Sequence, residues 1–312
     1  MARGPPIPTL SNCGRKAIQC TIVRGGPDKF TSPAYHTNQR THPGDLMSQA
    51  ARPNSIRSPI LAGWMCIGLL LLHGCLPSKD ASNALKIFAA ASLTEAFGEM
   101  KTAFEKAHPN IRIQLAFAGS QVLRLQIEQG APADVFASAN LAHLNALMEA
   151  KRVGASQAFA QNKLAIITPL DNPSQVLSFE DLAKASKIII GTEQVPVGIY
   201  ARQALAHANR FYGKDFEQKV MKRVVSQESN ARLVRAKVEM GEADAALVYL
   251  TDAFASKRVR RIAVPPGLNV RADYLMANVI GSQQQQQAAA WQQFVFSEDG
   301  KDILVRHGFS VN

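Results

Sequence analysis

Apolar runs of strand length and apolar runs of helical period alternate along the chain from about residue 84 onward. The range 84–89 is a short apolar run that predicts a strand. A helical period over 93–108 follows, set by Leu93, Ala96, Phe97, Met100 and Phe104. The range 111–117 alternates with a period of two, and 133–138 followed by 141–151 repeats the order of strand and helix. Repeated βα units predict an α/β fold with a largely parallel sheet.

The second half of the chain continues the same alternation. Strands are predicted at 164–168, 187–191, 245–250, 261–264 and 274–278. Helices are predicted at 199–209, 216–223, 231–240, 283–296 and 298–307. Between them, Val224 and Val225 are extended and 226–230 forms a polar loop.

The first part of the chain has a different character. Residues 1–46 lack periodicity and are rich in Pro, Gly, Thr, Ser and Asn, so we interpret them as disordered or as an upstream extension included by an early start codon. Met47 is the better start, because two arginines then precede an apolar run over 60–72. That run is short for a bilayer span and typical of a signal peptide, which we place at 47–74.

Leu72-His73-Gly74-Cys75 is similar to a bacterial lipobox, in which the cysteine becomes the lipidated first residue. Cys75 is therefore the predicted lipid anchor, with 75–82 as a polar tether, and ordinary cleavage nearby is the alternative. None of the four cysteines lies beyond 75, so an exported mature chain would have no internal disulfide.

Composition and charge narrow the possible partners. The chain has 312 residues and is 46% hydrophobic, enough for one or two domains with a sizeable core. The net charge is +11, but residues 1–74 hold eight basic against two acidic residues, so much of the excess is N-terminal. The basic run at 257–261 is interpreted as a solvated face, and no nucleic-acid partner is expected. No Cys/His cluster suggests a metal site.

Four predicted strand-to-helix corners share one design. Each has small, capping, Gly or Pro residues just before a helix: Ala91-Ser92, Gly119-Ser120, Pro196-Val197-Gly198 and Ser229-Asn230-Ala231. Ser92 is predicted as an N-cap. Helix starts present free backbone N–H groups and a positive dipole end, and ligands of open α/β sheets bind at these edges. The corners are therefore either an anion site or ordinary helix caps.

Several ordered motifs then point to one family. They are Phe88–Thr94 (FAAASLT), Phe117–Ser120 (FAGS), Gly130–Phe136 (GAPADVF), Val195–Ala201 (VPVGIYA) and Gly241–Asp244 (GEAD) with Val248–Ala253 (VYLTDA). Together they resemble the molybdate-binding component of bacterial ABC importers, the ModA-type family, over roughly 83–312.

The resemblance implies a two-lobe periplasmic-binding-protein fold of type II, each lobe a mostly parallel sheet flanked by helices, with two crossover strands. Lobe one would comprise 83–162 and 257–312. Lobe two would comprise 163–250, with 251–256 as the hinge crossover.

The resemblance also implies a ligand set. Ser92 and Ser120 would bind an oxyanion through hydroxyl and backbone N–H, Val197 and Ala231 through backbone N–H, and Tyr249 through its phenolic O–H. None of these groups is charged, which suits a fully deprotonated dianion such as molybdate or tungstate. Phosphate keeps a proton at neutral pH and needs an acceptor, which this set lacks.

The implied protein is a monomeric, non-enzymatic binding protein without a cofactor. It would act in the periplasm or on the outer face of the cell membrane and deliver its ligand to a membrane permease. Sulfate or another oxyanion on the same fold is the first alternative. A secreted enzyme on a two-lobe scaffold is the second. Paired Tyr200 and Tyr249 would suit a ferric-ion binding protein, but that leaves the serine corners unused.

Overall fold

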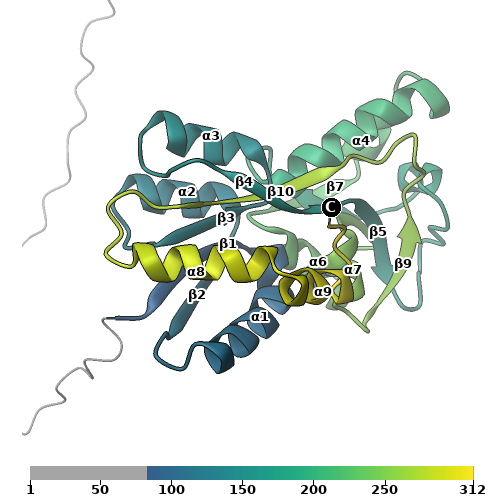
Figure 1. The fold of residues 1–312 in the computed structure, drawn as a ribbon. Helices are drawn as coiled ribbons and strands as arrows, with labels where there is room; N and C mark the ends of the chain where they lie inside the picture. Colours follow the sequence, from purple (N-terminus) through teal and green to yellow (C-terminus); the bar gives the residue numbers. More distant parts are fainter. Residues whose placement is uncertain (1–82, 312) are drawn as a thin grey trace, which may run out of the picture. The chain divides into compact units, whose positions relative to one another are not determined.

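The computed structural model describes residues 83–311. The predicted upstream extension (1–46), signal peptide (47–74) and tether (75–82), together with Cys75, lie outside them. Within 83–311, two five-stranded sheets form two lobes, each with helices on both faces (Figure 1). No helix in this range has the length and apolar character needed to cross a bilayer.

The first sheet has the strand order β2-β1-β3-β10-β4. Its strands are β1 (Leu85–Ala90), β2 (Ile113–Ala118), β3 (Val135–Ser138), β4 (Gln157–Asn162) and β10 (Ala272–Asn278). β1 pairs in parallel with β2 and β3, whereas β10 is antiparallel to both of its neighbours.

The second sheet repeats this plan with the order β7-β6-β8-β5-β9. Its strands are β5 (Leu164–Pro169), β6 (Ile188–Gly191), β7 (Val224–Glu228), β8 (Ala245–Tyr249) and β9 (Val259–Ala263). Here β6 is parallel to β7 and β8, and β5 is the antiparallel strand. The predicted α/β architecture with two mostly parallel sheets is therefore confirmed.

Helices connect the strands and cover the sheets. In the first lobe they are α1 (Thr94–Ala107), α2 (Ser120–Glu128), α3 (Leu141–Glu149), α8 (Gln285–Phe296) and α9 (Glu298–Arg306). In the second lobe they are α4 (Pro196–Tyr212), α5 (Phe216–Met221), α6 (Ala231–Glu239) and α7 (Leu250–Phe254). Two short 3-10 segments, η2 (Ala91–Leu93) and η3 (Glu180–Ala183), complete the set.

The helical period read from the sequence is the buried face of α1. Phe97, Met100 and Phe104 are fully buried, and the rings of Phe97 and Phe104 both meet the Trp291 ring edge-on with centroids 5.4 Å apart. Such edge-to-face pairs add about 0.5–1.5 kcal/mol beyond their area burial. α1 and α8 thus cover one face of the first sheet, while α2 and α3 pack on the other.

The chain crosses between the sheets twice. β4 ends at Asn162 and β5 begins at Leu164, so the first crossing spans a single residue. The side chain of Asn269 braces this crossing: its Oδ1 accepts from the Leu164 N–H at 2.8 Å, and its Nδ2 donates to the Leu164 carbonyl at 2.9 Å.

The predicted return to lobe one at 251–256 is wrong. Most of that range belongs to α7, and β9 then pairs with β5 in the second sheet. The chain therefore returns to the first sheet only at β10. The boundary at 257 failed because a strand's local pattern shows that it is extended but does not show which sheet supplies its partner.

Three local assignments also differ. β4 was not predicted. The polar loop assigned to 226–230 is largely strand, since β7 continues to Glu228 as an edge strand with exposed alternate residues. α4 begins three residues earlier than expected, because Pro196 occupies the first helical turn, where its missing N–H has no cost.

We expect Gly198→Ala to destabilise the protein strongly, by about 3 kcal/mol or more. An added Cβ would overlap the backbone carbonyls of Thr192 and Gly191, which cannot shift cheaply. Gly98→Ala in α1 is the matched control, because nothing lies within 4 Å of its added Cβ. It should stabilise the helix by about 0.5–1 kcal/mol. Chemical denaturation measures both, and equal effects of the two variants would contradict the packing described here.

Candidate functional site

All five residues predicted to hold a ligand line one cavity between the lobes. The space between its lining atoms is about 210 Å³ when the part open to solvent is included. The remaining wall consists mostly of small residues: Ala90, Ala91, Ala118, Gly119, Ala139, Val195, Pro196 and Asn230. No residue in this wall is charged, and the structure draws Ser92 and Ser120 from lobe one and Val197, Ala231 and Tyr249 from lobe two.

Ser92 lies in the 3-10 turn between β1 and α1. The prediction that it caps the helix is wrong, because the turn moves the N-cap position of α1 to Leu93 and no side chain caps it. The Ser92 hydroxyl instead lies 2.7 Å from the hydroxyl of Tyr274. Ser92 therefore contributes to the cavity through a buried, hydrogen-bonded hydroxyl and not as a helix cap.

Ser120 is the first residue of α2, directly after Gly119. Its Oγ accepts a hydrogen bond from the Ala139 N–H at 3.1 Å, so the serine proton remains available. A Cβ on Gly119 would overlap the carbonyl oxygen of Ser229 from the other lobe, so only glycine allows this approach.

Val197 and Ala231 lie in the first turns of α4 and α6. The Asn230 side chain caps α6 by accepting from the Leu233 N–H at 3.0 Å. The N–H groups before Leu233 have no acceptor within the helix, as at every helix start. Both helix starts thus direct backbone donors and a positive dipole end toward the cavity.

Tyr249 ends β8 and is 2% exposed. Its hydroxyl has no hydrogen-bond partner among residues 83–311. Burial raises the pKa of Tyr249 well above its usual value, so the phenol stays protonated and can only donate to an anion. An unpartnered buried hydroxyl costs about 1–3 kcal/mol, which a ligand in the cavity would offset.

Contacts between the lobes ring the cavity. Gln121 Nε2, beside Ser120, donates to the Ser229 carbonyl at 2.8 Å. The Glu95 carboxylate of α1 forms an ion pair with Arg232, beside Ala231. Each of these contacts adjoins a predicted ligand residue, so the two lobes are held together at the site itself.

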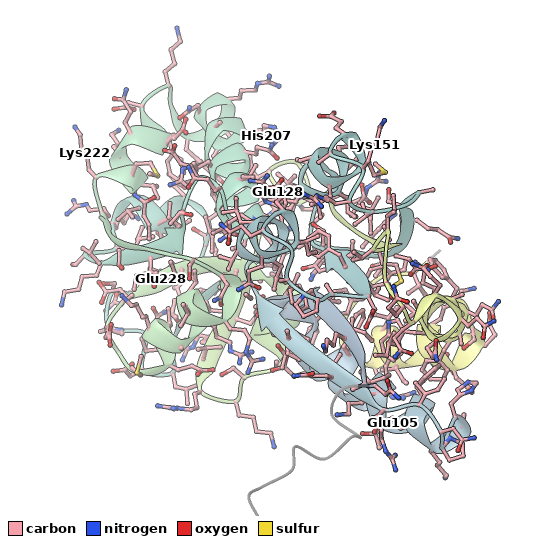
Figure 2. The ribbon with its side chains drawn as sticks, turned by 90° about the vertical axis from the view of Figure 1, so that its left-hand side faces the viewer. Glu105, Glu128, Lys151, His207, Lys222 and Glu228 are labelled. Atoms are coloured by element: carbon pink, nitrogen blue, oxygen red, sulfur yellow. The ribbon has the colours of Figure 1, made fainter. Side chains whose placement is uncertain are left out.

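Figure 2 shows Glu105 and Lys151 on the first lobe and Lys222 and Glu228 on the second, and none of these charged side chains lines the cavity. Within the described range, no group of His, Cys, Asp and Glu side chains could hold a metal ion. Neutral donors therefore dominate the chemistry of the cavity.

Sequence analysis missed two polar side chains behind the cavity. Tyr274 of β10 contacts Ser92, and Asn162 at the end of β4 donates to the Thr251 hydroxyl at 2.9 Å. The available signal was a tyrosine directly before the apolar residues Leu275, Met276 and Ala277, since a buried tyrosine hydroxyl needs a partner.

Asp252 is a buried carboxyl three residues after Tyr249. Neither of its side-chain oxygens has a hydrogen-bond partner within 83–311. Burial raises the pKa of Asp252 to about 7, and the positive charge of Arg235 opposes that rise.

Comparison with known proteins identifies relatives of the chain. Residues 85–310 match the family model described as bacterial extracellular solute-binding protein. The chain is 30% identical over 256 residues to the putative ABC transporter substrate-binding lipoprotein YvgL of Bacillus subtilis, covering 78% of this chain and 94% of that protein. It is 32% identical over 237 residues to the molybdate-binding protein ModA of Mycobacterium tuberculosis, covering 75% of this chain and 87% of that protein.

A solved structure is also similar. The substrate-binding domain of a putative molybdenum ABC transporter from Clostridium difficile is 28% identical in sequence, with a TM-score of 0.57. The alignment covers 73% of this chain and 99% of that one.

We expect Asp252→Asn to change the pH dependence of stability. The unfolded carboxyl titrates near 3.8 and the folded one near 7, so between these pH values the unfolded chain releases a proton that the folded protein keeps. The free energy of unfolding of the wild type should therefore fall relative to that of the variant by up to about 1.4 kcal/mol per pH unit between these two values. Above about pH 7 the difference should stay constant.

Denaturant unfolding of both proteins from pH 4 to 8.5 measures this difference. Asp181→Asn is the control, because Lys184 lowers the pKa of Asp181 to about 2 and its effect should therefore be nearly constant above about pH 5, where the unfolded carboxyl is also ionised. A wild-type-to-variant difference at Asp252 that does not change with pH would contradict the assignment of a buried carboxyl.

Proposed function

The chain belongs to the bacterial extracellular solute-binding protein family, and we propose that it captures molybdate or tungstate between its lobes and delivers it to the permease of an ABC importer. The observation that carries the proposal is the convergence of Ser92, Ser120, Val197, Ala231 and Tyr249 on one cavity without a charged side chain. Relatives that are named for molybdate or molybdenum support the choice of ion.

The energetics suit a dianion held by neutral donors. A hydrogen bond to a charged acceptor contributes about 1.5–3 kcal/mol, so five would contribute on the order of 10 kcal/mol before the costs of closure. The dipoles of α2, α4 and α6 add positive potential where the charge would lie.

Selection among oxyanions follows from the donors. Phosphate carries a proton near neutral pH, and the cavity wall offers no carboxylate to accept it. Sulfate has no such proton, so cavity size must separate it from the larger ions, and sulfate remains the alternative ligand. Molybdate and tungstate are nearly equal in size and should both bind.

Other functions have less support. The cavity wall contains no His, Cys, Asp, Glu, Lys or Arg, and hence no nucleophile paired with a base for a secreted enzyme. Ferric ion would need phenolates, but burial raises the pKa of Tyr200 to about 12 and its hydroxyl donates to the Ala139 carbonyl at 3.3 Å. We therefore propose a non-enzymatic monomer that acts outside the cytoplasm, anchored through Cys75.

Titration of the purified protein with molybdate, tungstate, sulfate and phosphate tests the proposal. We expect molybdate and tungstate to raise the melting temperature in proportion to RT ln(1 + [L]/Kd), with little effect of phosphate. Thermal shift and Trp291 fluorescence follow binding. Absence of any response to molybdate and tungstate would refute the proposed function.

Removing the serine hydroxyls should weaken binding. Ser92→Ala and Ser120→Ala should each raise the molybdate Kd about 10- to 100-fold, since each deletes a hydrogen bond to a charged acceptor. Ser186→Ala is the control, because Ser186 is exposed and does not line the cavity. Isothermal titration calorimetry measures the Kd values, and equal affinities of all three variants would mean that the serines do not touch the ligand.

A further inference from the structure

The Ser92 hydroxyl is the end of a buried chain of polar groups. Ser92 Oγ lies 2.7 Å from Tyr274 Oη, and Tyr274 Oη lies 3.4 Å from Asn162 Nδ2. The same Asn162 nitrogen donates to Thr251 Oγ1 at 2.9 Å. All four side chains are buried, and only Ser92 reaches the cavity wall.

The direction of these hydrogen bonds follows from the Asn162 amide. Its Oδ1 accepts from the Lys163 N–H at 2.9 Å, which turns the NH₂ group toward Tyr274 and Thr251. An amide nitrogen can only donate, so the Tyr274 oxygen accepts from Asn162. Because that oxygen already accepts one hydrogen bond, we assign Tyr274 as the donor in its contact with Ser92 Oγ.

In this assignment the Ser92 hydroxyl accepts one hydrogen bond and keeps its own proton free to donate. Its oxygen accepts from Tyr274, and its own proton finds no other acceptor within the described part of the chain. Ser120 has the same arrangement, because its Oγ accepts from the Ala139 N–H. Both serine protons are therefore available to a group in the cavity that can accept.

We propose that Tyr274 and Asn162 are positioning residues that fix Ser92 as a hydrogen-bond donor to the bound oxyanion and thereby disfavour protonated oxyanions. This inference rests on the proposed function. Without the Tyr274 hydroxyl, Ser92 could rotate and accept a proton from the ligand as readily as donate one.

The hydroxyl of Tyr274 can be separated from the packing of its ring. The ring meets Phe159, Tyr249 and Phe309 edge-on, with centroids 6.4, 5.7 and 5.2 Å away, and a phenylalanine would keep these contacts. A purely structural role predicts a loss of stability without a specific link to Ser92. The positioning role predicts an effect on ligand affinity that is present only when the Ser92 hydroxyl is present.

A double-mutant cycle with molybdate, measured by isothermal titration calorimetry, separates these roles. Tyr274→Phe should raise the Kd about tenfold in the wild-type background and leave it unchanged in the Ser92→Ala background. The ratio of the phosphate Kd to the molybdate Kd should also fall in Tyr274→Phe. Additive effects of the two substitutions, or an unchanged Kd and ratio in Tyr274→Phe, would overturn the inference.

Two further variants complete the experiment. Tyr212→Phe is the control, because Tyr212 packs against Phe179 and Phe216 away from the cavity, and it should bind as wild type does. If Tyr274→Phe does not fold, Asn162→Ala in the same two serine backgrounds tests the same chain, with the same non-additive result expected. Failure of the wild type to bind molybdate would refute the proposed function, whereas wild-type binding with an additive cycle would refute only the positioning role.

Discussion

Buried hydrogen-bond donors that lack acceptors constrain this structure more than any other feature. The buried Tyr249 hydroxyl has no hydrogen-bond partner within residues 83–311, and the Ser120 hydroxyl accepts from the Ala139 N–H, which leaves its proton free. The Ser92 hydroxyl contacts that of Tyr274 and is assigned the same accepting role. The first turns of α4 and α6 add backbone N–H groups at the same place. Such an arrangement is unfavourable in an apolar cavity and favourable around a deprotonated anion, because the anion supplies every missing acceptor.

The contacts that hold the lobes together lie beside the donors of the cavity. Gly119 admits the Ser229 backbone without a side chain between them, and Gln121 then bonds to the Ser229 carbonyl. Glu95 and Arg232 form an ion pair between the lobes. Glu95 is three residues after Ser92, and Arg232 directly follows Ala231. Each of these contacts between the lobes thus involves a residue next to a proposed ligand residue. We therefore expect ligand binding and lobe closure to be coupled.

The sequence predicted the α/β class, the two mostly parallel sheets and the five residues that meet in the cavity, because local periodicity and short family motifs carry that information. It did not predict that β9 stays in the second sheet, since strand pairing depends on a distant partner. The 3-10 turn before α1 was missed because Ser92 has the composition of an ordinary cap and only the contact with Tyr274 shows its other use. Tyr274 is 182 residues from Ser92, and Asn162 is 112 residues from Tyr274. No local sequence pattern extends over such separations.

The most direct measurement is a crystal structure grown with tungstate, in which the metal is located by its anomalous scattering. The donor arrangement predicts one strong peak in the cavity, with tungstate oxygens about 2.7–3.2 Å from Ser92, Ser120 and Tyr249 and from the N–H groups of Val197 and Ala231. A peak elsewhere, or tungstate held by charged side chains, would contradict the claim that neutral donors from two lobes define the site.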